Sequence, residues 1–537
     1  MERPLGAQIS HMLRDRGVDV IFGIPGVHNQ ELYRGIEEAG ITHVLARHEQ
    51  GAGFMADGYA RATGKPGVAY VITGPGLTNI MTPMGQAYSD SVPMLVISSC
   101  LDETAAKKGQ LHRMKDQRAA AEAVCDWSEE ARTAHAAYAL IDRAFVEFET
   151  QRPRSKHVQV PINALQSLAA PPPAAPSVTA SGPSYVSDAG AQYLGHRLAE
   201  AERPLFIFGG GLVRDPEDTQ IASWVKRLLR QTGAACFVTY AGRGLVAPDH
   251  PMCLGASLAR DGSRAALAQS DLVIAFGTEL SECDLWRTEL GFAGHFIRID
   301  IDPVVVQDEH RATEGIVADP AAMVRSLCNT KNVKPTTSSW AADEIAEHRH
   351  RWRAEIDAER PGIVPVCDAL RECLPDGTMI YSDMTQFAYV AKEVWDMDCP
   401  GHWHHPTGFG TLGYATPAAI GGAVARRGKP TMAIIGDYGF HYTMQELGVA
   451  VELGLPLPIF LWDNGKLKEI EESMVRAQIA PNAVVARNPD FSKLALAFGA
   501  YAAAPQSISE MQDAVRAAFD ADGPTLIHVT PGLSSAC

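Results

Sequence analysis

The sequence lacks the features that mark zinc proteins, secreted proteins and membrane proteins. Its ten cysteines include no CxxC pair, which argues against a zinc site and against a disulfide framework. No apolar run approaches the ~18 residues of a membrane span. The N-terminal stretch MERPLGAQISHMLRDRG is charged and amphipathic, without the apolar core of a signal peptide. We therefore expect a cytoplasmic protein with no membrane partner.

The sequence also lacks any basic run. Its formal net charge is -16, so no segment could follow a phosphate backbone, and we expect no nucleic-acid partner. Hydrophobic residues, in contrast, make up 46% of the 537 residues. That supply can fill several cores, and the length corresponds to about three domains of ordinary size.

Two segments of biased composition divide the chain into three blocks. LAAPPPAAPSVTASGPS, residues 168–184, is rich in Pro, Ala and Ser, and KNVKPTTSS covers residues 331–339. Both are typical of linkers. We therefore predict an N-terminal domain over residues 1–168, a central domain over 186–330 and a C-terminal domain over 345–537.

Each block alternates short apolar runs with helical patterns. The runs include VDVIFGIPG, GVAYVITGPG and PMLVISS in the first block, PLFIFGGG, SDLVIAFG and HFIRIDIDP in the second, and TMIYSD, PTMAIIGDYG, LPIFLWDNG and PTLIHVTPG in the third. Continuous apolar strands between helices favour parallel sheets covered on both faces. We predict three doubly wound α/β domains. No exact repeat is present, and the first and third blocks are candidates for distant structural copies.

Two polar residues end neighbouring predicted strands of the third block. Asp437 follows TMAIIG, and Asn464 follows LPIFLWD, 27 positions later in the sequence. Because a right-handed crossover brings parallel strand ends to one edge, the two side chains can meet. A carboxylate and an amide oxygen suit Mg²⁺ or Ca²⁺, with room for phosphate oxygens. The alternative is that both residues belong to turns or caps.

A carboxylate begins a helix of small residues in the first block. In RHEQGAGFMADGYARATGKPG, residues 47–67, Glu49 precedes Gly51, Ala52, Gly53 and other small residues at near-helical spacing. That spacing predicts close packing against another element. Glu49 could be a simple helix cap, and the residue alone does not exclude this.

The third block contains the segment GDYGFHYTMQELGVAVELGLPLPIFLWDN, with a Gly-Asp start, an M-Q-E-L helix and an Asn near its end. This segment resembles the thiamine-diphosphate motif, in which the Asn falls at the same distance. Tyr438 replaces the usual Gly and Asp463 replaces the first Asn of the motif. The resemblance implies that Mg²⁺ is bound by Asp437, Asn464 and a backbone carbonyl, which we assign to Lys466.

Other segments resemble the same family in the same order along the chain. They are FGIPG, the Glu49 segment, TGPGLTN, IDIDP and GTLGYATPAAIGG. The pattern is similar to the acetolactate-synthase-like branch of thiamine-diphosphate enzymes. The resemblance implies the following cofactor-binding residues: Pro25, Gly26, Glu49, Thr73, Asn79, Gln386, Gly410, Leu412, Gly436, Asp437, Tyr438, Gly439, Asn464 and Lys466.

The resemblance also implies roles for Glu49 and for the 410–412 segment. Thiamine becomes a nucleophile when its thiazolium C2 gives a proton to its own 4′-amino group in the imino form. A buried carboxyl group bonded to the pyrimidine N1′ promotes that form, and Glu49 takes this role. Leu412 would be the apolar wedge that bends the cofactor, while the carbonyls of Gly410 and Leu412 hold the amino group. Plain core packing is the alternative for Leu412.

Assembly and further cofactors follow from the same resemblance. In the family, the glutamate domain of one chain faces the diphosphate domain of another, so we expect a homodimer or a homotetramer with active sites between chains. Relatives bind FAD or ADP in the central domain. Here FGGG, residues 208–211, lacks a full dinucleotide fingerprint, so we expect a structural central domain and consider FAD unlikely.

The expected reaction begins with a 2-oxo acid, which loses CO₂ to leave an enamine. Protonation then gives an aldehyde, whereas attack on a second oxo acid gives an acetohydroxy acid. NGKLKEIEESMVRAQ lacks the Trp that acetohydroxyacid synthases carry after the metal-binding Asn. GVHNQELYRGI and GQLHRMKDQRA are instead similar to decarboxylases of 5-guanidino-2-oxopentanoate. His28 and His112 would be catalytic proton donors, or merely loop histidines.

Three functions therefore remain open. The first is decarboxylation of a 2-oxo acid, the second is acetolactate-type carboligation, and the third is cofactor binding without turnover, against which the retained Glu49, Asp437 and Asn464 argue. Glu469 and Glu472 or Ser473 share a helical face after Asn464 and could bind a cationic substrate tail. The alternative is a solvated face balanced by Lys466 and Lys468.

Overall fold

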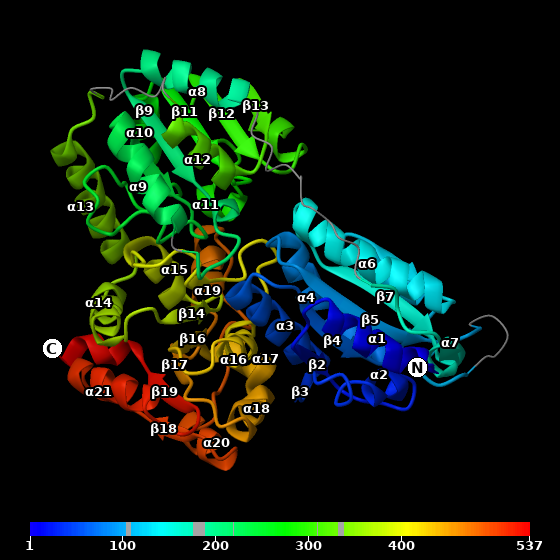
Figure 1. The fold of residues 1–537 in the computed structure, drawn as a ribbon. Coiled ribbons are helices and arrows are strands. Elements are labelled where there is room, and N and C mark those ends of the chain that lie inside the picture. Colours follow the sequence, from blue (N-terminus) through cyan, green and yellow to red (C-terminus); the bar gives the residue numbers. More distant parts are fainter. Residues whose placement is uncertain (104–108, 175–187, 219, 309, 331–337, 537) are drawn as a thin grey trace.

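Three parallel sheets, each flanked by helices, make up the molecule (Figure 1). The computed structural model describes residues 1–103, 109–174, 188–218, 220–308, 310–330 and 338–536. The prediction of three doubly wound α/β domains is confirmed. Of the two predicted linkers, residues 175–184 and 331–337 lie outside the described residues.

The N-terminal sheet has six parallel strands, and its inner strands are buried along their whole length. In spatial order they are β3 (Thr42–Leu45), β2 (Val20–Gly23), β4 (Gly67–Val71), β5 (Met94–Cys100), β7 (Lys156–Pro161) and β6 (Ser128–Glu130). Its helices are α1 (Leu5–Asp15), α2 (Gln30–Arg34), α3 (Glu49–Thr63), α4 (Pro75–Ser89), α5 (Gln117–Glu122), α6 (Ala134–Thr150) and α7 (Ile162–Gln166). A short antiparallel pair, β1 (Arg3–Pro4) and β8 (Leu168–Ala169), joins the first and last segments of the N-terminal domain.

The central sheet has five parallel strands. Their order is β10 (Ala235–Val238), β9 (Pro204–Phe208), β11 (Leu272–Phe276), β12 (His295–Asp300) and β13 (Glu314–Val317). Around it lie α8 (Asp188–Glu200), η1 (Gly210–Leu212), α9 (Gln220–Thr232), α10 (Ser263–Ala268), α11 (Glu282–Leu285), η2 (Val305–Gln307) and α12 (Pro320–Asn329). The next helix, α13 (Ala342–Glu359), stacks its Trp352 on Phe237 of this core at 6.0 Å between ring centroids.

The C-terminal sheet has the same strand order as the N-terminal sheet. It runs β15 (Trp403–His404), β14 (Met379–Ser382), β16 (Thr431–Gly436), β17 (Pro458–Trp462), β19 (Thr525–Val529) and β18 (Tyr501–Ala503). Its helices are α14 (Ile363–Cys373), α15 (Gln386–Val394), α16 (Ala415–Ala425), α17 (Asp437–Thr443), η3 (Met444–Glu446), α18 (Leu447–Glu452), α19 (Lys468–Arg476), α20 (Phe491–Ala497), α21 (Ile508–Phe519) and η4 (Pro531–Ala536). Numbered along each block, both orders are 2-1-3-4-6-5, which supports a structural relationship between the two blocks.

Each sheet has a switch point, which is a pair of adjacent strands whose following connections run to opposite sides of the sheet. These points lie between β2 and β4, between β9 and β11, and between β14 and β16. In open parallel sheets, ligands bind beyond the carboxyl ends of the strands at such a point. The topology therefore provides one candidate crevice in each domain.

The small residues of α3 pack against α16, so the N- and C-terminal domains of one chain contact each other directly. A Cβ built on Gly58 would lie 2.0 Å from the carbonyl oxygen of Ala418, and one on Gly421 would lie 1.9 Å from that of Met55. These paired positions run in opposite directions, so the helices are antiparallel. The predicted close packing of the Glu49 helix is confirmed.

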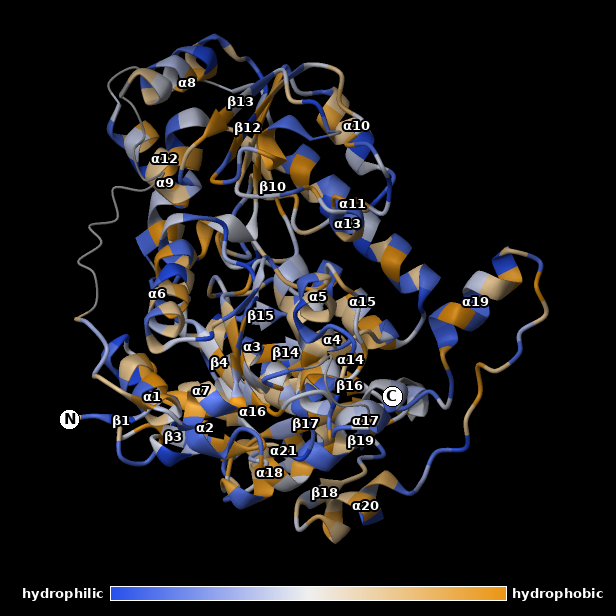
Figure 2. Cartoon of the chain, turned by 90° about the vertical axis from the view of Figure 1, so that its right-hand side faces the viewer, coloured by the Kyte–Doolittle hydropathy of each residue, from blue (hydrophilic) through white to orange (hydrophobic). Residues whose placement is uncertain are grey.

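One helix stands apart from the three cores. Figure 2 shows α19 and the segment after it at the outer edge of the C-terminal domain, and α19 has no buried residue. Its apolar side chains Ile470 and Val475 are 49% and 59% exposed. Within the described residues, no helix combines the length and apolar character needed to cross a membrane.

Candidate functional site

The predicted N-terminal site residues gather at the carboxyl edge of their sheet. Pro25 and Gly26 follow β2, Glu49 follows β3, and Thr73 follows β4. A Cβ on Gly26 would lie 2.3 Å from the Ile72 side chain, so the two loops beside the switch point touch. The Thr73 hydroxyl pairs with Ser99 Oγ at 2.8 Å, which fixes this turn to β5.

Glu49 is buried and held from the side. Asn79 Nδ2 donates to Glu49 Oε2 at 2.9 Å, and Glu49 is only 8% exposed. His48 is the N-cap of α3, because its ring Nδ1 accepts from the Gln50 amide at 3.1 Å. The Glu49 carboxylate is thus directed to Asn79, whereas the hydrogen bond that caps α3 is made by the preceding residue, His48.

Glu446 of the C-terminal domain reaches the same segment. Its two carboxylate oxygens accept from the Arg47 amide at 3.2 and 3.0 Å, and a Cβ on Gly51 would lie 2.3 Å from its Cδ. Burial raises the pKa of Glu446 to about 7, against the lowering effect of the backbone hydrogen bonds from Arg47 and His48; Glu49 adds a smaller raising effect. Sequence reasoning missed this residue, although it lies within the M-Q-E-L segment.

His28 and His112 meet beside this edge. Their ring centroids are 4.8 Å apart at 70°, and neither Nδ1 has a hydrogen-bond partner among the described residues. Burial lowers the pKa of His28, and His112 lowers it further, while Asp102 opposes both. His112 has a φ of 62°, a left-handed conformation that is strained for a non-glycine residue. The structure therefore brings the two predicted histidines together.

In the C-terminal domain, Asp437 and the residues after β17 lie side by side. The register pairs Gly436 with Trp462, which places Asp437 beside Asp463. Asn488 Nδ2 bridges them, donating to Asp437 Oδ2 at 2.8 Å and to Asp463 Oδ1 at 2.9 Å. Burial raises the pKa of Asp437. Burial acts in the same direction on Asp463, but hydrogen bonds from His528 at 2.9 Å, the Gly465 amide and Asn488 together outweigh it and hold the pKa of Asp463 below its usual range.

The donors available to a metal at this edge are oxygens. Asn464 Oδ1 accepts from the Lys466 amide at 3.2 Å, a turn that brings the Lys466 backbone next to the Asn464 side chain. No group of three or more His, Cys, Asp or Glu side chains that could hold a metal occurs in the described part of the chain. One carboxylate, one amide oxygen and one carbonyl would suit Mg²⁺ that also binds phosphate and water. These residues fit that ion.

The 410–413 segment is fixed by Asp383, at the carboxyl end of β14. Asp383 Oδ2 accepts from the Gly413 amide at 2.9 Å, and burial raises its pKa to about 6. Gly410 has a φ of 67°, which a side chain would strain. Leu412 is half-buried. Asp383 was missed by sequence reasoning, although it ends the run TMIYSD and the strand-end rule could have found it.

The glycines of the Asp437 loop are tight against protein atoms. A Cβ on Gly436 would lie 3.0 Å from Thr385 Oγ1, and one on Gly439 would lie 3.0 Å from Asp383 Oδ2. Tyr438, between them, is half-buried. These contacts explain why both positions are glycine, because a side chain there would crowd Thr385 or Asp383. They also hold the start of α17 against the end of β14 at the switch point.

Glu49 and Leu412 lie at opposite ends of the α3–α16 pair. Gly58 faces Ala418 and Met55 faces Gly421, so the start of α16 lies beside the end of α3. Glu49 is the first residue of α3 and Thr63 the last, which separates the two ends by roughly 20 Å at the rise of an α-helix. Glu49 and Leu412 of one chain are therefore not adjacent.

The acids of α19 already have partners. Arg360 donates to Glu469 from Nε at 2.9 Å and from Nη2 at 3.1 Å. Glu472 pairs with Lys468 at 3.3 Å. The face is therefore largely balanced by basic residues, and the main partner of Glu469 is Arg360 rather than a lysine.

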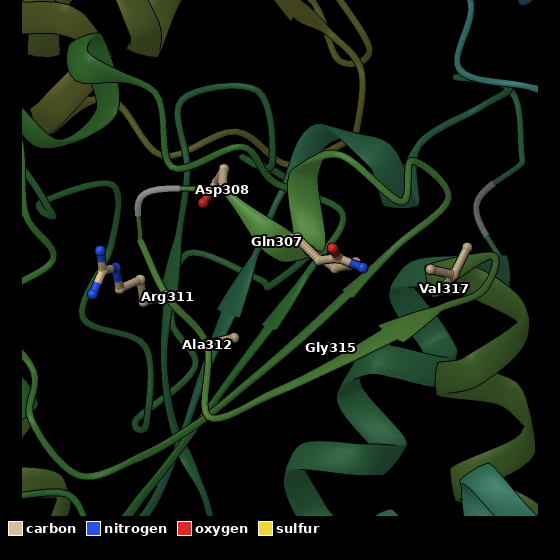
Figure 3. A pocket seen from close by; sticks show the side chains of 7 residues that line it. Gln307, Asp308, Arg311, Ala312, Gly315 and Val317 are labelled. Atoms are coloured by element: carbon tan, nitrogen blue, oxygen red, sulfur yellow. The ribbon is translucent and has the colours of Figure 1, made fainter.

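Two backbone hydrogen bonds join the strand ends at the switch point of the central domain. The Gly209 and Gly211 amides donate to the carbonyls of Phe276 and Gly277 at 2.8 and 2.9 Å, so these two amides are not free for a pyrophosphate. A cavity of about 340 Å³ lies elsewhere in this domain and is lined by Val306, Gln307, Asp308, Arg311, Ala312, Gly315 and Val317 (Figure 3). No predicted site residue lines it. A cavity of about 480 Å³ beside α19 includes Lys466.

Comparisons with known proteins agree with this arrangement. Three family models match: the N-terminal TPP binding domain of thiamine pyrophosphate enzymes over residues 3–120, their central domain over 192–327, and their C-terminal TPP binding domain over 383–529. The probable 2-ketoarginine decarboxylase AruI of Pseudomonas aeruginosa is 40% identical over 531 residues, covering 98% of this chain and 93% of that protein. The large subunits of acetolactate synthase isozymes 2 and 1 of Escherichia coli are 28% and 26% identical, covering 98% of this chain and 95% and 94% of theirs.

Proposed function

The chain belongs to the thiamine pyrophosphate enzyme family, and from this premise we propose that it decarboxylates a 2-oxo acid to an aldehyde with thiamine diphosphate and Mg²⁺. The observation that carries the proposal is the buried Glu49, held by Asn79, together with Asp437 and Asn464 at the edge of the other TPP-binding domain. A non-enzymatic homologue would have no reason to keep a buried carboxylate at that edge.

The residues have distinct roles in this proposal. Bound thiamine diphosphate would supply a nucleophilic thiazolium carbon. Glu49 would hold a proton toward the pyrimidine N1′, and Asn79 fixes the orientation of its carboxylate. Asp437, Asn464 and the Lys466 carbonyl would hold Mg²⁺. Leu412 and Gly410 would orient the pyrimidine. His28 or His112 would give the proton that replaces CO₂ on the aldehyde carbon.

The active site requires a second copy of the chain. Because Glu49 and Leu412 are roughly 20 Å apart within one chain, Glu49 of one protomer would serve the diphosphate domain of its partner. Exposed apolar side chains on the carboxyl edges support this arrangement: Val27 and Leu111 are 64% and 60% exposed, and Val475 is 59% exposed. A dimer is the smallest assembly that completes two sites, and a tetramer would be a pair of dimers.

The substrate is proposed to be a 2-oxo acid with a long, cationic tail. The relative from Pseudomonas aeruginosa is named for 2-ketoarginine. The half-buried Glu469 lies in the first turn of α19, and Gln386 connects it by hydrogen bonds to the proposed metal ligand Asn464. Carboligation is the second candidate, supported by the acetolactate synthase relatives. The absence of Trp between Asn464 and Gln478 favours decarboxylation.

The deciding experiment compares three acids at equal concentration. Purified protein with thiamine diphosphate and Mg²⁺ is given 5-guanidino-2-oxopentanoate, 2-oxoisocaproate or pyruvate, and CO₂, aldehyde and acetolactate are measured. The proposal expects aldehyde from the guanidino acid. Preference for pyruvate with acetolactate as the main product would replace it with the synthase function.

Metal binding is tested by Asp437→Ala. A buried Mg²⁺ would lose its one charged protein ligand, so calorimetric binding of thiamine diphosphate should no longer depend on Mg²⁺. Asp463→Asn, which installs the residue usual in the motif, is the matched control and should retain the dependence. Unchanged metal dependence in Asp437→Ala would place the ion elsewhere.

We propose that the central domain is structural and carries no FAD. The bonded amides of Gly209 and Gly211 support this, as does the incomplete fingerprint. Purified protein should show no flavin absorbance after denaturation. A stoichiometric yellow cofactor would contradict the proposal and strengthen the synthase alternative.

A further inference from the structure

The Glu469 carboxylate already binds a guanidinium group, that of Arg360. Arg360 Nε donates to Oε1 at 2.9 Å and Nη2 donates to Oε2 at 3.1 Å, the two-pronged geometry in which Arg binds carboxylates. Gln386 Nε2 also donates to Oε1, at 2.9 Å. The Glu469 and Arg360 side chains remain 24% and 20% exposed. The site can therefore bind a guanidinium and is open to solvent.

This carboxylate lies next to the proposed cofactor site. Gln386 accepts from Asn464 Nδ2 at 3.5 Å, so a single side chain separates Glu469 from a proposed metal ligand. Gln386 also begins α15, beside the switch point of the C-terminal sheet. A 2-oxo acid that reacts at this edge, with a tail of several atoms, would extend toward Glu469.

We propose that Glu469 determines specificity for a cationic tail, and that Arg360 is an internal substitute that the substrate's guanidinium displaces. The inference rests on the proposed decarboxylation of a 2-oxo acid at this site. Glu469 would bind Arg360 in the substrate-free state and the guanidinium of the substrate in the bound state.

The exchange is feasible because it replaces like with like. The substrate's guanidinium would restore the two hydrogen bonds that Arg360 gives up, so the carboxylate is never left unpaired. Arg360 also has a second carboxylate neighbour, Glu359, at 3.5 Å, and Glu393 raises the pKa of Arg360. Both acids also pair with Arg260, so the displaced guanidinium would stay in acidic surroundings that it shares with Arg260.

Specificity follows from what other tails cannot do. A neutral tail cannot compete with Arg360, so it gains nothing from Glu469. An ammonium tail is a point charge and cannot reproduce the two-pronged contact. We therefore expect the preference to fall from guanidinium to ammonium to neutral tails.

Neighbouring acids provide a matched control. Glu471 pairs with Lys466 and Lys468, each at 3.0 Å, and Glu472 pairs with Lys468. Both belong to the same exposed helix as Glu469, but their partners are local lysines. Glu472→Gln removes an equal charge from α19 without touching Arg360.

The test compares kcat/KM for 5-guanidino-2-oxopentanoate and 2-oxoisocaproate in the wild type, Glu469→Gln, Arg360→Gln and Glu472→Gln. Glu469→Gln should lower the preference for the guanidino acid about tenfold or more, with kcat/KM for 2-oxoisocaproate within about threefold. Arg360→Gln removes the competitor, so KM for the guanidino acid should fall. Glu472→Gln should retain the preference.

Two results would overturn the inference: an unchanged preference in Glu469→Gln, or a loss in Arg360→Gln as large as in Glu469→Gln. If Glu469→Gln does not fold, Arg360→Gln decides alone through the direction of its KM change. If 2-oxoisocaproate is decarboxylated but neither variant alters the preference, only this inference fails. If no 2-oxo acid releases CO₂, the proposed function itself fails.

Discussion

Glu49 combines burial, an amide partner and a position at a strand end. Replacing it with Gln keeps the shape and the contact with Asn79 but removes the acid. We expect Glu49→Gln to fold and to bind thiamine diphosphate, yet to lose about 10²- to 10⁴-fold in kcat, the usual contribution of acid–base assistance. Steady-state turnover and calorimetric binding measure the two effects. Parental turnover in the variant would reduce Glu49 to a structural residue.

Glu446 gives a pH-dependent prediction. Because burial raises its pKa from the ordinary value of 4.5 to about 7, the folded chain takes up this proton more readily than the unfolded chain does. The stabilisation is complete below about pH 4.5 and is lost as pH rises through 7. Relative to Glu446→Gln, which stays neutral, the wild type should lose on the order of 1–3 kcal/mol between pH 5 and 8.

Thermal midpoints of both proteins across that pH range test this prediction. The difference between them should shift in favour of the variant as pH rises. A constant difference would mean that Glu446 keeps the same charge in both states throughout. The charged side chains that shift the pKa of Glu446, Arg47 and Glu49, are present in both proteins.

The limits of sequence analysis are clearest at single residues. Asp437 and the residues around Asn464 could be paired in advance because each ends a strand and parallel neighbours share an edge. Asn488 and Arg360 could not, because each contacts its partner from a loop or a helix end, 51 and 109 positions away. Hydrophobic periodicity carries no information about such side-chain contacts.

The packing of α3 on α16 depends on two missing side chains. Gly421→Ala would place a methyl group where the Met55 carbonyl lies, 1.9 Å away, so the helices must separate. We expect a loss of about 1–3 kcal/mol or more and a lower thermal midpoint. Gly448→Ala in α18 is the control, because its nearest atom lies at an ordinary 3.6 Å and helix propensity should stabilise it by roughly 0.5–1 kcal/mol. Equal effects would contradict the packing argument.

Inner strands were predictable and several others were not. β4, β5 and β16 are buried on both faces, so they appear in the sequence as unbroken apolar runs. Edge strand β18 is partly exposed and has no such run. β7 is buried but contains Lys156, which is neutralised by Asp126 and Glu147 at 2.6 and 2.7 Å. A buried ion pair hides a core strand from a search for apolar residues.

Shared sites can be tested by mixing two inactive chains. Glu49→Gln and Asp437→Ala are each expected to be inactive alone. If the site lies between protomers, a mixed dimer contains one intact site, and equal co-expression should restore about a quarter of wild-type activity. If each chain forms its own complete site, the mixture stays inactive. Purification through two different affinity tags isolates the mixed dimer for the measurement.

The antiparallel contact between α3 and α16 also affects what happens in a cell that makes normal and damaged chains together. Each chain would contribute its two ends to two different sites, so the outcome of a damaged gene copy depends on where the damage falls. A chain with Glu49→Gln alone leaves every normal chain with one working site, and the normal copy still provides its full share of activity. A chain with both Glu49→Gln and Asp437→Ala spoils both sites of any normal partner. Either lesion alone would leave the activity of the normal chains intact. Both lesions on one chain would also inactivate the normal chains that pair with it.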